Sequence, residues 1–229
     1  MRRMALLGAV GVALSLSGCS DAKTASKDNF KTAISAYVET QQPCLRIPAS
    51  IERPEGANPP DFPRYVSAVP TTTVPQQQGR ERERAPFDAL VEAGLLSATD
   101  TTIKVRSGIF AGDVKDMPVR AYELTPAGRE AVSEVGARTA ITRPEHRFCY
   151  GKPTVDEVVS FTEPADVMGV KASQVTYRYH LADLPAWATH ATMLDTFAQL
   201  KRDTAPSLEG KTAVILTSEG WVHERAFKR

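Results

Sequence analysis

Eight prolines within residues 43–79 place the strongest constraint on how this chain can fold. Proline fixes φ and lacks a backbone N–H, so a continuous helix is excluded over this segment. Two short pieces within it, residues 45–48 and 64–69, are expected to be extended and to pack. A loop of this length in a compact domain is usually functional or disordered. We therefore expect either an interaction segment or an ordered wrap.

Helical patterns flank the proline-rich segment. Apolar residues recur at i, i+3, i+4, i+7 and i+8 from Phe30, which predicts an amphipathic helix over residues 28–41. The alternating charges of residues 80–84 are typical of a solvated helix start or linker. Pro86 is expected to open a second helix, and Gly94 to end it in a left-handed conformation.

The first nineteen residues are typical of an export signal. Arg2 and Arg3 precede an uncharged apolar run that is too short to span a bilayer. The run ends in Leu16-Ser17-Gly18-Cys19, which resembles the lipobox of bacterial lipoproteins. That resemblance implies cleavage before Cys19, which then carries lipid chains. An ordinary cleaved signal or a membrane anchor with a chance cysteine is the alternative.

The lipobox resemblance also implies a location. It implies a multiply acylated Cys19, and two or more chains hold a protein stably on a membrane. In lipoproteins of double-membraned bacteria, Asp after the cysteine commonly signals retention in the inner membrane, and this chain has Ser20 there. We therefore expect an outer-membrane protein facing the periplasm. Asp21, one place later, keeps the inner membrane as the alternative.

With Cys19 lipidated, one pair of cysteines remains, Cys44 and Cys149. Outside the cytoplasm such a pair is expected to form a disulfide. The bridge would join the N-terminal region to the C-terminal one and stabilise the fold by about 4 to 5 kcal/mol in the chain-entropy model. Two separate buried thiols are the alternative. Neither cysteine has the spacing of a redox or metal motif.

A helix, two strands and a further helix are expected within residues 80–135. Their segments are Leu90-Val-Glu-Ala-Gly-Leu-Leu96, strands at 101–106 and 119–124, and Tyr122-Glu-Leu-Thr-Pro-Ala-Gly-Arg-Glu-Ala-Val132, with a last helix running from Thr125 to about residue 135. Together they resemble the back half of a winged helix of the MarR type. The elements that should precede the recognition helix are replaced by the proline-rich segment.

An exported protein meets no chromosomal DNA, so this resemblance does not lead us to expect DNA binding. We expect the shape of a winged helix, used as a surface for contact with another protein. A generic helix, hairpin and helix is the alternative to the winged helix. The net charge also gives no reason to expect a nucleic acid as a partner. Removal of residues 1–18 leaves 26 basic against 27 acidic residues, a net charge of −1.

Strand patterns dominate residues 143–229, where an antiparallel sheet with one helix, over residues 189–202, is expected. Residues 174–181 alternate in polarity. Val175, Tyr177, Tyr179 and Leu181 are expected on one face, and Thr176, Arg178 and His180 on the other. The remaining strands are expected at 146–150, 154–162, 211–217 and 221–227.

These elements predict an α+β protein. We expect a signal peptide over residues 1–18, a lipidated tether over 19–27, a helical and winged-helix-like domain over 28–142, and an antiparallel α+β domain over 143–229. A composition of 42% hydrophobic and 24% charged residues suits a globular core.

The sequence contains no nucleophile elbow, phosphate loop or dinucleotide fingerprint, and we expect no cofactor and no metal. We expect a lipid-anchored structural or protein-interaction module of the cell envelope, whose partners are the membrane and an envelope protein. A small-ligand-binding module is the alternative, and an enzyme is the least favoured interpretation. The candidate ligand face is the open side of the C-terminal sheet, with Tyr177, Tyr179, His180, Trp221 and His223.

Overall fold

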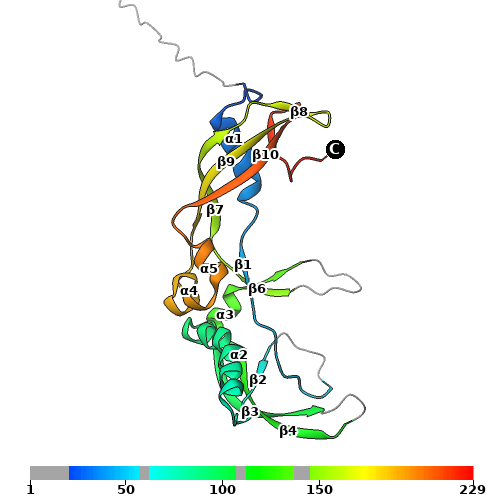
Figure 1. The fold of residues 1–229 in the computed structure, drawn as a ribbon, viewed down its shortest axis with the longest axis vertical. Helices are drawn as coiled ribbons and strands as arrows, with labels where there is room; N and C mark the ends of the chain where they lie inside the picture. Colours follow the sequence, from blue (N-terminus) through cyan, green and yellow to red (C-terminus); the bar gives the residue numbers. More distant parts are fainter. Residues whose placement is uncertain (1–20, 57–61, 107–111, 137–144, 229) are drawn as a thin grey trace, which may run out of the picture.

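The computed structural model describes residues 21–56, 62–106, 112–136 and 145–228. The chain forms an elongated molecule with three antiparallel sheets that follow one another along its long axis (Figure 1). Helices accompany each sheet, which confirms the α+β class. The expected signal peptide and the lipobox with Cys19 lie outside the described residues. None of the described helices is long and apolar enough to cross a membrane.

The upper tier consists of α1 (Lys27–Val38) packed on a five-stranded sheet. Phe30 and Ile34 are fully buried against Val175 and Val214 of the sheet. We expected α1 to belong with residues 28–142, but its apolar face is part of the C-terminal core. The strands have the order β11-β10-β9-β7, with β8 paired to β9, and are β7 (Lys152–Phe161), β8 (Ala165–Val167), β9 (Val170–Ala182), β10 (Leu208–Leu216) and β11 (Trp221–His223).

Residues 21–26 were expected to be part of a tether, but they form a turn held to this tier. Asn29 Nδ2 donates hydrogen bonds to the carbonyls of Asp21 and Thr24, at 3.0 and 2.8 Å. Trp221 Nε1 donates to the carbonyl of Lys23 at 3.1 Å. The described chain is therefore held to the upper tier from residue 21 onward.

The middle tier is a three-stranded sheet of order β1-β6-β5, made of β1 (Cys44–Arg46), β6 (Glu145–Cys149) and β5 (Val132–Val135). Cys44 lies opposite Cys149 and forms the expected disulfide with it. The helix expected to reach residue 135 is shorter, since α3 (Pro126–Ala131) gives way to β5. Val132 pairs with Phe148 of β6, so strand pairing overrides the local helical pattern.

The lower tier is a sheet of order β2-β4-β3, with β2 (Arg64–Ser67), β4 (Val114–Leu124) and β3 (Leu96–Arg106), on which α2 (Val74–Glu92) packs. The expectation that this helix opens at Pro86 is wrong, because α2 begins at Val74 with Pro75 in its first turn. Pro86 lies inside the helix, where it removes the hydrogen bond to the carbonyl of Arg82, an exposed residue. Gly94 has a φ of +76°, as expected after the helix.

One apolar core joins the lower and middle tiers. Phe87 of α2, Tyr122 of β4 and Phe148 of β6 belong to it, and so do Met193 and Leu200. The helix expected over residues 189–202 is divided into a 3-10 turn (Ala186–Thr189), α4 (Ala191–Thr196) and α5 (Ala198–Asp203). The division at Phe197 allows Met193 and Leu200 to be fully buried in the same core.

Candidate functional site

A cavity of about 330 Å³ opens where α1 ends and the five-stranded sheet continues beyond it. We call it the tyrosine cavity, and its walls include Tyr37, Tyr177, Tyr179, Thr212 and His223. Tyr177 and Tyr179 lie on one face of β9 because side chains alternate along a strand. Burial raises the pKa of both phenols. Both therefore remain neutral hydrogen-bond donors at physiological pH.

Tyr177 depends on a glycine for its position. Gly210 of β10 lies directly opposite Tyr177 in the antiparallel pair. A Cβ atom at Gly210 would overlap Cζ of Tyr177 and would lie 2.6 Å from its hydroxyl oxygen. The ring therefore covers the bare backbone of Gly210, as aromatic side chains do for glycines in sheets.

His223 forms the polar side of the tyrosine cavity. It is only 5% exposed, and the ring of Tyr37 stacks on it with centroids 4.1 Å apart. The backbone N–H of Arg225 donates to Nδ1 at 3.1 Å, so the proton of the neutral ring sits on Nε2. Nε2 lies 2.9 Å from Oγ1 of Thr212, and that hydroxyl donates to Glu224 Oε1 at 3.1 Å.

The direction of these hydrogen bonds limits the chemistry of His223. Burial lowers the pKa of the ring and favours its neutral form. Because Nε2 donates to Thr212, the ring cannot take a proton from that hydroxyl in this arrangement. The network holds the His223 ring and Thr212 in fixed orientations.

The expected ligand face is only partly assembled. Tyr177, Tyr179 and His223 line the cavity. Trp221 is buried under α1, where its ring packs edge-on against Phe30 with the ring centroids 4.8 Å apart. His180 points to the opposite face of the sheet, with Nδ1 2.8 Å from Oδ1 of Asp156. Sequence patterns missed Tyr37 and Thr212, because no local signal indicated that α1 covers this sheet.

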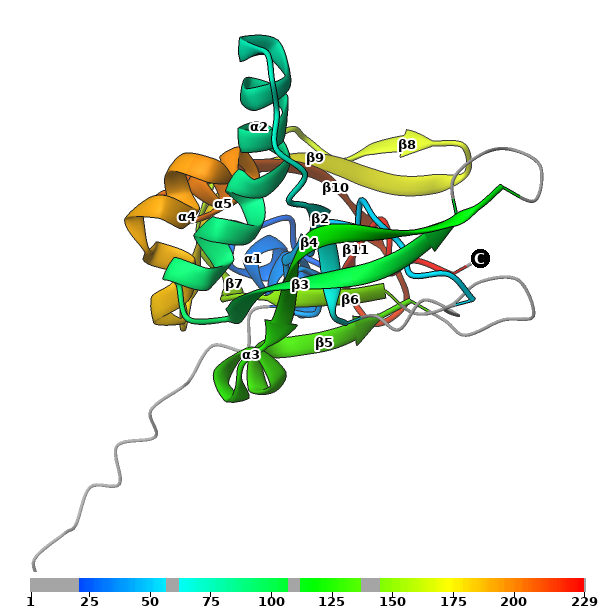
Figure 2. The same ribbon diagram turned by 90° about the horizontal axis from the view of Figure 1, so that it is seen from below.

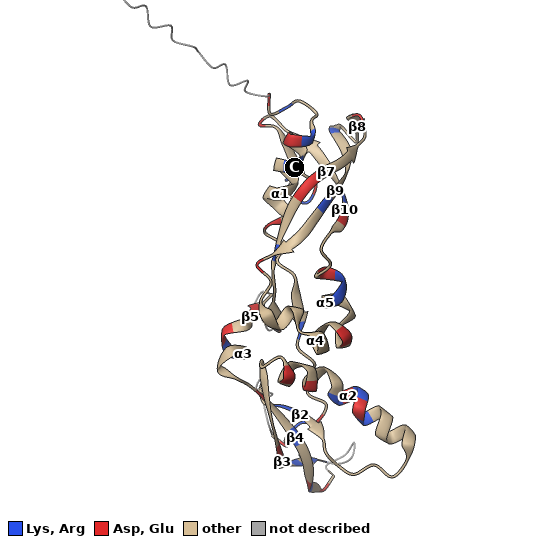
Figure 3. Ribbon diagram, turned by 90° about the vertical axis from the view of Figure 1, so that its left-hand side faces the viewer, with Lys and Arg blue, Asp and Glu red and all other residues tan. Residues whose placement is uncertain are grey.

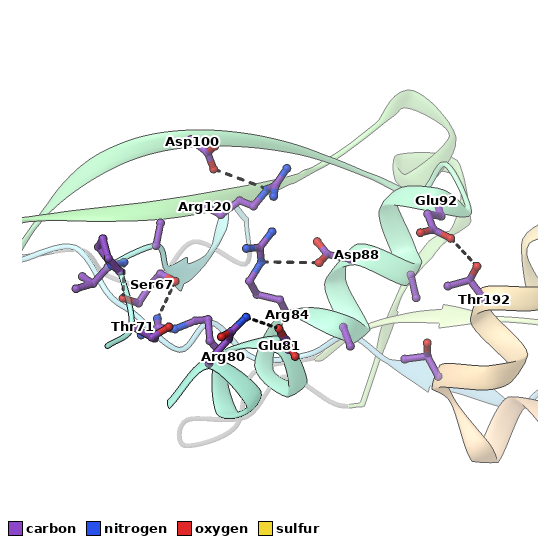
Figure 4. A pocket seen from close by; sticks show the side chains of 17 residues that line it. Ser67, Thr71, Arg80, Glu81, Arg84, Asp88, Glu92, Asp100, Arg120 and Thr192 are labelled. Atoms are coloured by element: carbon purple, nitrogen blue, oxygen red, sulfur yellow. Dashed lines mark hydrogen bonds and ion pairs between the residues drawn. The ribbon is translucent and has the colours of Figure 1, made fainter. Parts of the chain in front are cut away.

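A second, larger cavity of about 730 Å³ lies in the lower tier between α2, residues 67–71 and β4, with α4 at one end (Figure 4). We call it the arginine groove, after Arg80 and Arg84 of α2 and Arg120 of β4. Arg84 Nε lies 3.8 Å from Asp88 Oδ2, and Arg120 Nε lies 3.8 Å from Asp100 Oδ1. Both pairs are too long for a hydrogen bond and their side chains are partly exposed, so each contributes about 1 kcal/mol or less. The guanidinium groups can therefore exchange these carboxylates for those of a ligand at little cost.

One side of the arginine groove is better fixed. Asp88 accepts a 2.8 Å hydrogen bond from the hydroxyl of Tyr122, and Arg80 Nη1 donates to the carbonyl of Ser67 at 2.7 Å. Burial, together with the carboxylate of Asp88, raises the pKa of Tyr122 to about 12. Glu92 of α2 accepts a hydrogen bond from Thr192 of α4, which joins the two helices at the end of the groove.

The first half of α2 stands away from the body of the molecule (Figure 2). From residue 74 to residue 86, every side chain is exposed or only half-buried. Both signs of charge alternate over residues 80–84, whereas residues 74–79 at the outer end of the helix carry no charge (Figure 3). Because none of its side chains is buried, this half of α2 gains little stability from packing on the rest of the fold. Short helices without such packing are only marginally stable in water. The surface of this half of α2 is available to another molecule beside the groove.

Within the part of the chain that the structure describes, no three His, Cys, Asp or Glu side chains converge as a metal site. Among known proteins, no family model, no curated protein and no solved structure matches this chain.

Proposed function

We propose that this protein is a lipid-anchored lipoprotein of the bacterial cell envelope that holds a protein partner at its arginine groove. The motif that ends in Cys19 supports the lipid anchor, and Ser20 supports the outer membrane with the protein facing the periplasm. The observation that carries the proposal is the separation of the two ends. The chain enters at the upper tier, and the arginine groove lies in the lower tier (Figure 1).

The short distance between the lipid and the body strengthens this arrangement. Only Ser20 separates Cys19 from Asp21, and residues 21–26 are held by Asn29 and Trp221. A lipid on Cys19 would therefore keep the five-stranded sheet close to the membrane. The lower tier would then extend away from the membrane to where soluble or anchored proteins can reach it.

Two features of the lower tier support a protein as the partner. The first half of α2 offers a helical surface without packing of its own. The arginine groove beside it holds Arg84 and Arg120 in weak pairs that a partner's carboxylates can replace. In this proposal the unit formed by α2, β3 and β4, whose sequence resembles part of a winged helix, would serve protein contact.

Site-specific photo-crosslinking in the cells that make the protein tests the partner. A benzophenone side chain is placed at Gln77 in the groove, and a matched control is placed at Gln174, which is exposed on β9. We expect a discrete adduct from position 77 and none from position 174. The adduct should disappear with Arg84→Glu and persist with Lys201→Glu, an exposed change on α5. An adduct that survives Arg84→Glu would reject the groove as the binding site.

Replacing the lipobox cysteine tests the anchor. We expect Cys19→Ala to abolish incorporation of labelled fatty acid and to leave an unprocessed precursor or a soluble protein. Membrane fractionation and acid-labile or alkali-labile lipid analysis measure this. Unchanged labelling and unchanged fractionation would refute the assignment of the lipobox.

The tyrosine cavity favours a second candidate function, the binding of a small ligand. Its neutral phenols at Tyr177 and Tyr179 and the fixed ring of His223 suit a small aromatic molecule with hydrogen-bond acceptors. A panel of such compounds tested by thermal shift is expected to yield stabilising compounds whose effect is lost in Tyr179→Ala. Equal shifts in wild type and Tyr179→Ala would remove this candidate. An enzyme has less support, given the donor role of His223 Nε2.

A further inference from the structure

The turn between β8 and β9 presents apolar side chains that the fold does not use. Met168 is 89% exposed and Val167 is 50% exposed. Met168 has a φ of +52° and Gly169 a φ of +83°, the left-handed pair that two-residue hairpin turns need. Asn or Asp before Gly is the ordinary choice for such a turn, because L side chains rarely adopt this conformation. Neither the turn nor the core accounts for a methionine at this position.

Strand register places this turn at the end of the molecule where the described chain begins. Ile215 of β10 lies opposite Ala172 of β9, and continuing that register by three residues brings Ser218 level with Gly169. The turn after β10 contains Gly220, where an added Cβ would lie 3.1 Å from the carbonyl oxygen of Ala22. Both hairpin turns and residue 22 therefore share one end of the upper tier (Figure 1).

We propose that the β8–β9 turn inserts Val167 and Met168 into the membrane leaflet that holds the lipidated Cys19, an inference that rests on the proposed lipid anchor. Two residues of extended chain span at most about 7 Å, so a lipid on Cys19 brings the start of the body to the headgroups. Asp166 and Lys171 form the next cross-strand pair behind the tip. This charged pair would lie among the headgroups while the two apolar side chains reach the acyl chains.

A second membrane contact has a consequence that a lipid alone does not supply. A protein held at one point can swing about its anchor, whereas contacts at both Cys19 and Met168 define an orientation. The long axis of the molecule would then stand at a preferred angle to the membrane, with the arginine groove at the far end.

Fluorescence from a label on the turn tests the insertion. Met168→Cys supplies the single free thiol of the lipidated protein, because Cys44 and Cys149 are bridged and Cys19 is acylated. Val74→Cys, at a 66% exposed position that begins α2, is the matched control. Each full-length lipidated variant is labelled with an environment-sensitive fluorophore and reconstituted into mixed vesicles of phosphatidylethanolamine and phosphatidylglycerol.

We expect the label at position 168 to shift to shorter emission wavelength and to be quenched by brominated lipids. The label at position 74 should be quenched by aqueous iodide instead. If both labels are equally open to iodide while the protein floats with the vesicles, the insertion is overturned and the lipid anchor stands. If the protein does not float with the vesicles, the anchor and the insertion are both overturned. Matching circular dichroism spectra of the two variants establish that each is folded.

Discussion

Replacing Gly210 by alanine tests how the tyrosine cavity is built. The new methyl group would overlap Cζ of Tyr177 and lie 2.6 Å from its hydroxyl oxygen, closer than real Cβ contacts. The ring must therefore leave the surface of Gly210. Tyr177 is only 8% exposed and belongs to the core beneath α1, so moving its ring disturbs packing that the sheet depends on.

The expected loss of stability follows from two opposing effects. Alanine is favoured over glycine inside a strand by about 0.5–1 kcal/mol. Forcing extra volume into a packed core costs about 1–3 kcal/mol. We expect Gly210→Ala to lower the free energy of unfolding by up to about 2.5 kcal/mol, because the cost of the added volume exceeds the gain from replacing glycine. Urea titration followed by far-UV circular dichroism measures this change, with the slope against urea unchanged.

Two controls separate ring displacement from other causes. Gly79→Ala makes the same chemical change within α2, where an added Cβ meets nothing within 4 Å, and should stabilise the protein by about 0.5–1 kcal/mol. In a Tyr177→Ala background, Gly210→Ala should lose its cost, because the ring it displaces is gone. An equal cost in both backgrounds would refute the explanation through Tyr177.

Three further outcomes are expected. Gly128→Ala should lower the free energy of unfolding by about 3 kcal/mol in urea titrations, because the methyl group would overlap the Leu95 carbonyl, which accepts a hydrogen bond from the Thr125 N–H. An unchanged free energy of unfolding would contradict this contact. Cys149→Ala should lower the free energy of unfolding by about 4–5 kcal/mol, less any native strain of the disulfide. In the wild type Cys44 should be alkylated only after reduction, and rapid labelling of the unreduced, unfolded protein would rule out the bridge. Because burial lowers the pKa of His223 in the fold, the unfolded chain binds more protons below about pH 6.5, so thermal stability should fall there; an identical pH slope in His223→Gln would exclude this cause.

Elements whose pattern is local could be predicted from the sequence. The alternation of Val175, Tyr177, Tyr179 and Leu181 correctly indicated which face of β9 is buried. The helical spacing from Phe30 predicted α1 to within three residues at its end. In both cases the buried side chains repeat with the period of the element, which is information that a short segment carries by itself.

Features that depend on tertiary contacts could not be predicted in this way. The first half of α2 buries no side chain, so its sequence has no hydrophobic periodicity that would indicate a helix. The prolines therefore led to the prediction that the helix begins only at Pro86. Nothing near Phe30 indicates that its helix packs on strands more than a hundred residues away. The same gap affected the tyrosine cavity, where Tyr177, Tyr179 and His223 were foreseen but Tyr37 and Thr212 were not. Trp221 was placed on an open face although α1 covers it.

The pairing of β1 with β6 has a mechanical consequence. The chain leaves the upper tier after Pro43 and returns at Tyr150, whose N–H donates to the Pro43 carbonyl at 3.0 Å, and the disulfide joins the neighbouring residues. A force applied to the lower tiers reaches the upper tier through these two strands and also through residues 183–207, which link β9 to β10 and pack α4 and α5 into the shared core. Hydrogen bonds between two short strands break one after another under tension, whereas the covalent bridge keeps either strand from sliding past the other. The disulfide thus fixes the register of β1 and β6 at the point where the chain passes between the tiers.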